Sequence, residues 1–231
     1  GRHVHFIFIE ASTLDDNGVP VYQYDRMVVD DIDDFPSRQE LVKWADDFAQ
    51  TAAEMVGAET GDTYIGPVLF TPRASAQLFT QLFVDNISDP RKPLTMDNRF
   101  DQYLGGARFV RKLNFRIMPE FISIVDDPTM REYNGMELRG YYEFDDQGVP
   151  AERILLVEDG RLRNYYMSRI PTKKIEESNG HGRLVQSMIG AVEVVGKPGN
   201  VIMQATETYD PEELKEQMVK LCREMGIEYG L

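Results

Sequence analysis

A short polar stretch rich in glycine, SNGHGR at residues 178–183, carries the side chains best suited to bind a ligand. Glycines let backbone N–H groups converge on an anion, and an arginine can hold a carboxylate through two parallel hydrogen bonds. The alternative is a turn whose polar groups satisfy one another. The candidate substrate-binding residues are Asn179, Gly180, His181, Gly182 and Arg183.

Two pairs of adjacent aspartates are the next candidates for chemistry. Paired carboxylates can act as general acid and base, and the sequence offers Asp126-Asp127 and Asp145-Asp146. Each pair adjoins turn residues, and aspartate side chains commonly accept hydrogen bonds from the backbone of a turn. We therefore predict turn capping, with catalysis as the alternative.

Three other features could suggest metal sites. His3 and His5 share one face of a predicted strand, and the acidic run at residues 30–34 offers oxygen atoms that suit calcium. The acidic run lacks the glycine and the distal glutamate of an EF-hand loop, so we predict that it is a solvated link. For His3 and His5, we favour ordinary strand histidines over a metal site. The single cysteine, Cys222, excludes an internal disulfide and a multi-cysteine metal site.

Composition excludes two classes of partner. The net charge is −14, and no cluster of lysine and arginine offsets it, so direct binding to nucleic acid is not expected. No apolar run approaches the 18 or so residues that a membrane-spanning helix needs. The 231 residues, 42% of them hydrophobic, suffice for one large domain or two modest ones.

The first 62 residues predict a hairpin followed by a helix. Residues 3–10 and 21–29 have strand composition, and the DDNG sequence at 15–18 is typical of a turn. Ser37 and Glu40 form a capping box that begins a helix. Its apolar face is predicted to comprise Leu41, Trp44, Ala45, Phe48, Ala52, Met55 and Val56.

The remainder, residues 63–231, predicts a largely antiparallel sheet with a few packing helices, so the fold class is α+β. A strand at 64–70 leads into a helix that begins at Pro72, and a long loop covers 86–110. Short links between the later strands favour antiparallel pairing. The predicted strands are 120–127, 138–146, 151–159 and 161–169, the last two joined by an Asp-Gly hairpin turn, and a final helix runs from Asp210 to Gly226 with Cys222 on its apolar side.

Several motifs, taken in order, resemble the TldD/PmbA family, also called modulator of DNA gyrase. They are GPVLFTPRASAQLF at 66–79, PEFISIVDDPTM at 119–130, FDDQGVPAERILLVEDG at 144–160 and SNGHGR. The resemblance is dense over 63–231 and looser over the first 60 residues. It implies that 63–231 is the C-terminal-type domain of a zinc peptidase scaffold, truncated at its C-terminal end. Residues 1–62 would then be part of an N-terminal or middle α+β region.

Active members of this family carry H-E-x-x-x-H on the helix that follows the G-P strand. In this sequence the same six positions, 80–85, read TQLFVD, so Thr80 and Asp85 replace the histidines and Gln81 replaces the glutamate. Zinc prefers imidazole and thiolate ligands, and an amide cannot take a proton from a bound water. Positions five apart differ by about 140° around a helix, so the family helix must distort or end there. Nothing within 80–85 forces that here, and Leu82 and Phe83 are expected to pack.

The resemblance therefore implies a catalytically silent, PmbA/TldE-like subunit that pairs with a homologous TldD-type subunit, or with itself, and holds extended peptide. Zinc is the cofactor of active members, and neither a metal nor another cofactor is expected in this chain. The ligand cysteine of the family lies downstream of residue 231, so Cys222 does not supply it. A cytoplasmic location is implied, or a periplasmic one if a signal peptide precedes this segment.

Two alternatives stay open at this point. One is an active metallopeptidase whose ligands lie elsewhere, for example at His181, at Asp85 or outside this sequence. The other is a stand-alone peptide-binding module.

Overall fold

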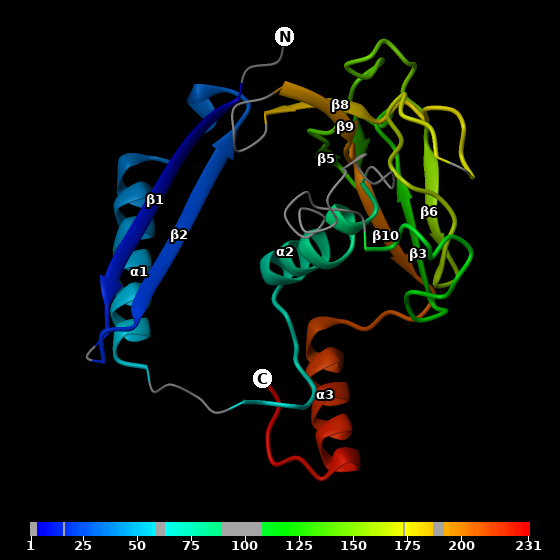
Figure 1. Cartoon of the computed structure of the whole chain (residues 1–231). Helices are drawn as coiled ribbons and strands as arrows, with labels where there is room; N and C mark the ends of the chain where they lie inside the picture. The colour runs from blue at the N-terminus through cyan, green and yellow to red at the C-terminus, as the bar shows by residue number, and fades with distance from the viewer. Residues whose placement is uncertain (1–3, 16, 59–62, 89–107, 173, 187–191) are drawn as a thin grey trace. The chain divides into compact units, whose positions relative to one another are not determined.

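The chain divides into two compact units, residues 1–65 and 66–231, in a computed structural model (Figure 1). The structure describes residues 4–15, 17–58, 63–88, 108–172, 174–186 and 192–231. Most of the predicted long loop at 86–110 lies outside these residues, as does His3. Each unit is described separately below.

The first unit is a hairpin with one helix on it. Strands β1 (His5–Leu14) and β2 (Pro20–Val29) pair antiparallel, with His5 opposite Val29. In the turn, Asp15 Oδ1 accepts hydrogen bonds from the backbone N–H groups of Asn17 (2.8 Å) and Val19 (2.7 Å). The hairpin and its turn confirm the prediction.

A short 3-10 turn, η1 (Ile32–Asp34), connects the hairpin to helix α1 (Arg38–Val56). Asp31 caps this turn by accepting from the backbone N–H of Asp33, which agrees with the predicted link between the hairpin and the helix. The capping box of Ser37 and Glu40 is formed as predicted. Phe48 is the buried residue of α1, whereas Met55, predicted on the same face, is 41% exposed.

The second unit contains a four-stranded antiparallel sheet in the order β10-β3-β6-β7. Its strands are β3 (Ile122–Asp126), β6 (Ile154–Glu158), β7 (Arg161–Leu162) and β10 (Val201–Ala205). Two smaller hairpins accompany it: β4 (Glu132–Tyr133) with β5 (Met136–Glu137), and β8 (Gly182–Gln186) with β9 (Val192–Gly196). The predicted fold class, α+β with a largely antiparallel C-terminal part, is confirmed.

The turn between β6 and β7 is the predicted Asp-Gly hairpin turn. Asp159 and Gly160 both have positive φ, 46° and 72°, which is what a type I′ turn requires. A Cβ on Gly160 would also collide with the backbone carbonyl of Met118, so glycine is needed here for space as well as for conformation.

Two predicted strands are absent, and a third is much shorter than expected. Residues 138–146 and 64–70 form no strand, and the strand predicted over 161–169 ends at Leu162. In the last case the ladder stops because both Arg163 and Asn164 donate to the same carbonyl, that of Leu156. Farther along, the backbone N–H of Met167 donates to a side chain, Asn179 Oδ1, instead of to a strand.

Two helices complete the second unit. Helix α2 (Pro72–Leu82) is followed by the 3-10 turn η2 (Val84–Asn86). Helix α3 (Pro211–Met225) begins at a capping box of Asp210 and Glu213 and ends at Gly226, as predicted. Cys222 is 5% exposed, which confirms it as a small buried hydrophobic residue. Among the described residues, no helix is both long enough and apolar enough to cross a membrane.

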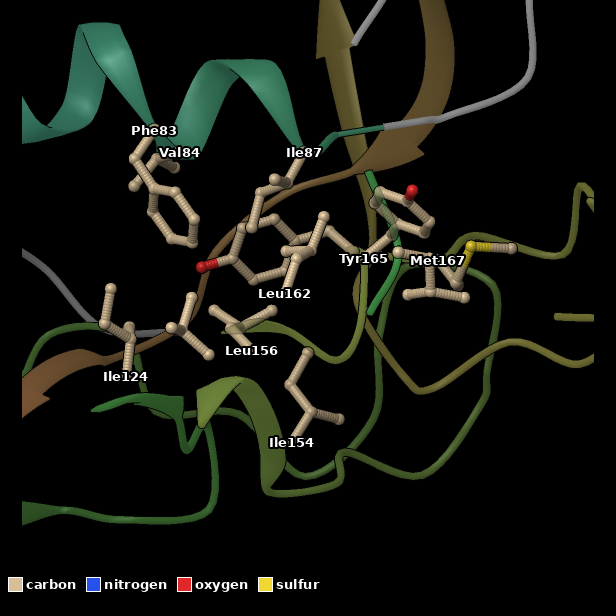
Figure 2. Packing of buried hydrophobic residues seen from close by; sticks show 12 residues of the cluster. Phe83, Val84, Ile87, Ile124, Ile154, Leu156, Leu162, Tyr165 and Met167 are labelled. Atoms are coloured by element: carbon tan, nitrogen blue, oxygen red, sulfur yellow. The ribbon is translucent and has the colours of Figure 1, made fainter. Parts of the chain in front are cut away.

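The core of the second unit joins the end of α2 to the sheet. Figure 2 shows Phe83, Val84 and Ile87 pointing from the α2–η2 segment toward the sheet side chains. The sheet and the segment after it contribute Ile124, Ile154, Leu156, Val157, Leu162, Tyr165, Tyr166 and Met167. This packing fixes where α2 ends, and α2 carries the candidate motif positions.

Candidate functional site

Helix α2 ends in the middle of the six motif positions, 80–85. Its last residue is Leu82, and the chain passes through η2 from Val84. No residue within 80–85 was expected to end the helix, and the structure shows the cause just beyond it. The Asn86 amide donates to the carbonyls of Gln81 (3.0 Å) and Leu82 (3.1 Å), which satisfies two carbonyls at the end of the helix. The break that a family metal site would need is therefore present.

The side chains at these positions have other partners. The Thr80 hydroxyl donates to the Ala76 carbonyl one turn earlier, at 2.8 Å. The Asp85 carboxylate lies 3.6 Å from the Lys197 ammonium. Phe83 is 2% exposed and packs as expected, but Leu82 is 57% exposed, so the packing predicted for it is wrong.

A zinc ion does not fit this donor set. Thr80 offers a neutral hydroxyl that is already bonded within its own helix, and Asp85 faces a cation. Zinc sites in proteins are built from imidazole, thiolate and carboxylate ligands, usually three or four together. Within the described residues, no group of three or more histidine, cysteine, aspartate or glutamate side chains could hold a metal.

The glycine-rich stretch at 178–183 lies in a buried polar cluster. Asn179 Oδ1 accepts from the Met167 backbone N–H (3.0 Å), and Asn179 Nδ2 donates to the Tyr165 carbonyl (2.8 Å). The His181 side chain is fully buried, and its Nδ1 lies 2.8 Å from the Asn179 carbonyl oxygen. A carbonyl oxygen only accepts, so this hydrogen bond requires the proton to be on Nδ1.

The second ring nitrogen of His181 faces Asp126. Nε2 lies 3.5 Å from Asp126 Oδ1, and both side chains are fully buried. Among the described residues, neither His181 Nε2 nor the buried Tyr166 hydroxyl has a well-formed hydrogen bond. The Gly199 backbone N–H donates to both carboxylate oxygens of Asp126, at 3.1 and 3.0 Å. The carboxylate thus joins β3 to the loop before β10.

Two tyrosines next to this cluster have raised pKa values. Burial is the main cause of the high pKa of Tyr166, and the negative charge of Asp126 adds to it. Burial, followed by Asp126, also raises the pKa of Tyr142, whose hydroxyl donates to the Gly180 carbonyl at 2.9 Å. Both tyrosines therefore stay neutral near physiological pH.

Of the five candidate binding residues, Arg183 is the one that reaches the surface. Its guanidinium carbon lies 4.4 Å from the centre of the Tyr142 ring, and its Nε donates to Asp146 Oδ2 at 3.2 Å. The side chain is 36% exposed, whereas Asn179 and His181 are 8% and 0% exposed as residues. A ligand at this stretch would therefore meet Arg183 first. The proposed binding role of the five residues stays a prediction.

Two of the four aspartates do what the turn interpretation predicts, and the other two do not. Asp127 Oδ1 accepts from Thr129, and Asp145 Oδ1 accepts from the backbone N–H groups of Gln147 and Val149. The exceptions are Asp126, whose partner Gly199 lies 73 residues away along the chain, and Asp146, whose partners Arg183 and Leu184 lie 37 and 38 residues away. No local sequence signal could have indicated those contacts.

Two further polar residues were missed by sequence reasoning. The Asn200 side chain accepts from Gly140 N (2.8 Å) and donates to the carbonyls of Asp127 and Met130. Lys197 pairs with Asp85, and its backbone N–H donates to the His181 carbonyl at 2.9 Å. Lys197 thus contacts both the motif positions and the glycine-rich stretch.

Asp146 gives a pH-dependence that can be tested. The backbone hydrogen bond from Leu184, at 2.7 Å, is the main reason why its pKa lies below the ordinary 3.8. Because the folded pKa is the lower one, the contribution of Asp146 is present above 3.8 and is lost as pH falls through the folded pKa. We expect Asp146→Asn to lower the melting temperature at neutral pH and to converge on the wild type as the pH falls below the folded pKa.

The control for this experiment is Asp159→Asn, which removes the same charge from the exposed β6–β7 turn. Asparagine tolerates the positive φ of that position. The Asp146 effect should be small, at most about 1 kcal/mol, since the group is largely solvated. A constant difference between Asp146→Asn and the wild type at every pH would contradict the assignment.

Curated proteins with related sequences are metalloproteases. A metalloprotease of Archaeoglobus fulgidus is 38% identical over 84 residues, which is 36% of this chain and 18% of that protein. A TldD homologue of Buchnera aphidicola, also named a metalloprotease, is 30% identical over 80 residues, or 34% of this chain and 16% of that protein. The matched segments thus cover less than a fifth of either relative.

Solved structures share the fold. TldE from Thermococcus kodakarensis superposes with a TM-score of 0.51 at 17% identity, covering 93% of this chain and 43% of that one. A protein from Thermotoga maritima, described as a modulator of DNA gyrase, gives a TM-score of 0.57 at 23% identity, covering 91% and 42%. This chain spans less than half the length of either structure.

The sequence model of the PmbA/TldA metallopeptidase C-terminal domain matches residues 62–223, well over half of the chain. This range includes α2 with the motif positions, the four-stranded sheet and the glycine-rich stretch. The chain therefore belongs to the PmbA/TldD metallopeptidase family.

Proposed function

We propose that this chain is part of a catalytically silent TldD/PmbA-type subunit. One observation carries the proposal: positions 80–85 keep the helix break of a metal site but not its ligands. Thr80 is bonded to its own helix, and Asp85 is paired with Lys197. With glutamine at 81 there is also no carboxylate to take a proton from a metal-bound water.

We further propose that the protein acts as one subunit of an assembly, paired with a homologous TldD-type subunit or with itself. Support comes from the family and from the similarity to TldE. In this proposal, residues 1–62 belong to the N-terminal or middle α+β region and residues 63–231 are the peptidase-type domain. The net charge of −14 argues against direct contact with DNA.

An extended peptide is the ligand we propose for the subunit. Strand β10 forms one edge of the four-stranded sheet, and such an edge can take an added strand. The β8–β9 hairpin is a separate two-stranded sheet, and the outer edge of β8 is already partly occupied, since Gly182 and Leu184 bond there to Asp145 and Asp146. Arg183, at the start of β8, could bind a peptide carboxylate if it exchanged its partner Asp146.

Zinc content and peptidase activity test the silence of the site. For the protein in its longest natural form, we expect far less than one zinc per chain and no peptide cleavage that a chelator abolishes. Adding an H-E-x-x-x-H homologue should restore chelator-sensitive cleavage. Stoichiometric zinc together with chelator-sensitive cleavage by this protein alone would overturn the proposal.

The active-peptidase alternative makes a different prediction for His181. If His181 were a ligand, its substitution by glutamine would abolish activity and remove the metal. The structure gives this alternative little support, because the ring is fully buried with Nδ1 bonded to Asn179 and Nε2 facing Asp126. A stand-alone peptide-binding module would instead recover no homologous subunit in a pull-down.

A further inference from the structure

Asp126 and His181 form a fully buried pair in the second unit, and we call these two residues the buried pair. A carboxylate without a counter-charge is costly in a protein interior, so a buried one is either paired or neutralised by a proton. Within the described residues, the ion-pair partner of Asp126 is His181, whose Nε2 lies 3.5 Å from Oδ1. The Gly199 N–H donates to both carboxylate oxygens, but it carries no net charge. The charge of Asp126 must therefore be balanced at His181.

The surroundings of the His181 ring favour a proton on each of its nitrogens. Nδ1 lies 2.8 Å from the Asn179 carbonyl oxygen, which can only accept a hydrogen bond. Nε2 faces the Asp126 carboxylate, which also only accepts when it is ionised. Among the described residues no group donates to Nε2, so a lone pair there would be buried, unsatisfied and next to a negative charge. A proton on Nε2 turns this repulsion into an attraction.

The groups around the ring do not supply another counter-charge for Asp126. Two tyrosine rings lie beside the imidazole, Tyr166 with 5.3 Å between ring centres and Tyr142 edge-on at 6.5 Å. Both stay neutral, because their pKa values are raised. The charged side chains next to the pair along the chain and in the adjoining turns have partners of their own: Arg183 with Asp146, Lys197 with Asp85, Asp145 with the Gly182 N–H, and Asp127 with Thr129.

We propose that His181 is a buried imidazolium, charged through its contact with Asp126, and that its second proton makes the packing of the SNGHGR stretch sensitive to alkaline pH. The ring contacts Asp126 in β3, and the His181 carbonyl accepts from the Lys197 N–H after β9 at 2.9 Å. Gly199, in the same loop as Lys197, binds the Asp126 carboxylate from another side. Loss of the proton would leave the buried carboxylate without its counter-charge, so these segments should separate more easily. The inference goes beyond the proposed function and does not depend on the zinc content of the protein.

The direction of the pH effect follows from the number of bound protons. Above about pH 6.5, a histidine in an opened or unfolded chain is mostly neutral, whereas an aspartate is ionised. Opening the structure around the buried pair at such pH therefore releases one proton. The stabilisation is complete below this pH and is lost as the pH rises, by up to about tenfold in the opening equilibrium constant per pH unit. Asp146 has the opposite sign, because its contribution is lost as the pH falls.

NMR of the protein labelled with 15N-histidine tests the protonation state directly. The His181 signals are assigned through their contacts with the rings of Tyr142 and Tyr166. We expect both ring nitrogens of His181 to carry a proton at about pH 7.5, where a solvated histidine is mostly neutral. In Asp126→Asn, which keeps the shape of the side chain but removes its charge, Nε2 should be unprotonated at the same pH. An unprotonated Nε2 in the wild type would overturn the inference, including the case in which Asp126 holds the proton instead.

Amide hydrogen exchange tests the effect of the proton on local opening. After correction for the pH-dependence of intrinsic exchange, the opening constants at the Lys197 and Gly199 amides should rise by up to about tenfold per unit between about pH 7 and 8.5. Asp126→Asn should remove this rise. Asp146→Asn is the matched control and should keep it, since Asp146 is fully ionised in this range.

Opening constants that stay unchanged with pH in the wild type would overturn the inference. So would an equal rise in the wild type and in Asp126→Asn. If Asp126→Asn does not fold, the ring protons and the pH-dependence of the wild type still decide the matter. None of these results bears on the zinc experiment above.

Discussion

Replacing Asp126 with alanine is expected to lower the free energy of unfolding of the second unit by about 2–3 kcal/mol. The carboxylate is fully buried, accepts two contacts from the Gly199 N–H and lies 3.5 Å from His181 Nε2. Its removal takes both acceptor oxygens from the Gly199 N–H and leaves a space beside the fully buried His181 ring. The loss should therefore exceed that of an ordinary surface carboxylate several times over.

Asp146→Ala is the matched control, since it removes the same group from a nearby carboxylate that is 39% exposed. We expect it to cost about 1 kcal/mol or less. The chain has a single tryptophan, Trp44, which lies in the first unit. Unfolding of the second unit is therefore best followed by amide hydrogen exchange of β3. Equal losses for the two variants would show that the buried contacts of Asp126 carry no special weight.

Local signals predicted much of the fold. The capping boxes that begin α1 and α3, the Asp-Gly turn after β6 and the alternation in β1 and β2 involve residues close together in the sequence, and all are present. In each of these features the interacting residues lie within about one helical turn or one hairpin of each other, so a short stretch of sequence is enough to predict it.

Predictions failed where the backbone bonds to distant groups. The apolar and aromatic composition of 161–169 favours a strand, but the Tyr165 carbonyl accepts from the Asn179 side chain and the Met167 N–H donates to it. The composition of 161–169 cannot predict these hydrogen bonds, because the Asn179 side chain belongs to another loop. The exposed Leu82 has a similar origin, since the chain turns at Phe83 to bury that ring instead.

The candidate site divides in the same way. The loss of ligands at Thr80, Gln81 and Asp85 can be read directly from residue identity. The new partner of Asp85 cannot be predicted in this way, because it is the Lys197 ammonium, which follows β9 in the chain. The buried pair of Asp126 and His181 also joins two motifs that look independent in the sequence.

Gly180→Ala is the second substitution with a large expected effect. Gly180 has φ of +70°, and a Cβ there would collide with the Pro150 carbonyl and lie 3.0 Å from Ala151 Cα. The left-handed conformation costs a side chain about 1–2 kcal/mol, and the collision with rigid backbone adds about 1–3 kcal/mol. Because Gly180 lies between Asn179 and His181, any shift that relieves the collision also disturbs the buried cluster.

Gly148→Ala separates these two causes. Gly148 has nearly the same φ, +75°, but nothing lies within 4 Å of the position where its Cβ would be. It should therefore show the conformational cost alone, and the difference between the two variants in denaturant-induced unfolding measures the close approach of Gly180 to Pro150. If both variants lose the same stability, the Pro150 loop moves aside at little cost, and the glycine in SNGHGR is needed only for its backbone angle. If Gly180→Ala loses about 1–3 kcal/mol more, glycine is required at this position for space as well as for its backbone angle. The stretch is then tightly packed, and Arg183 is the candidate residue that a ligand could reach.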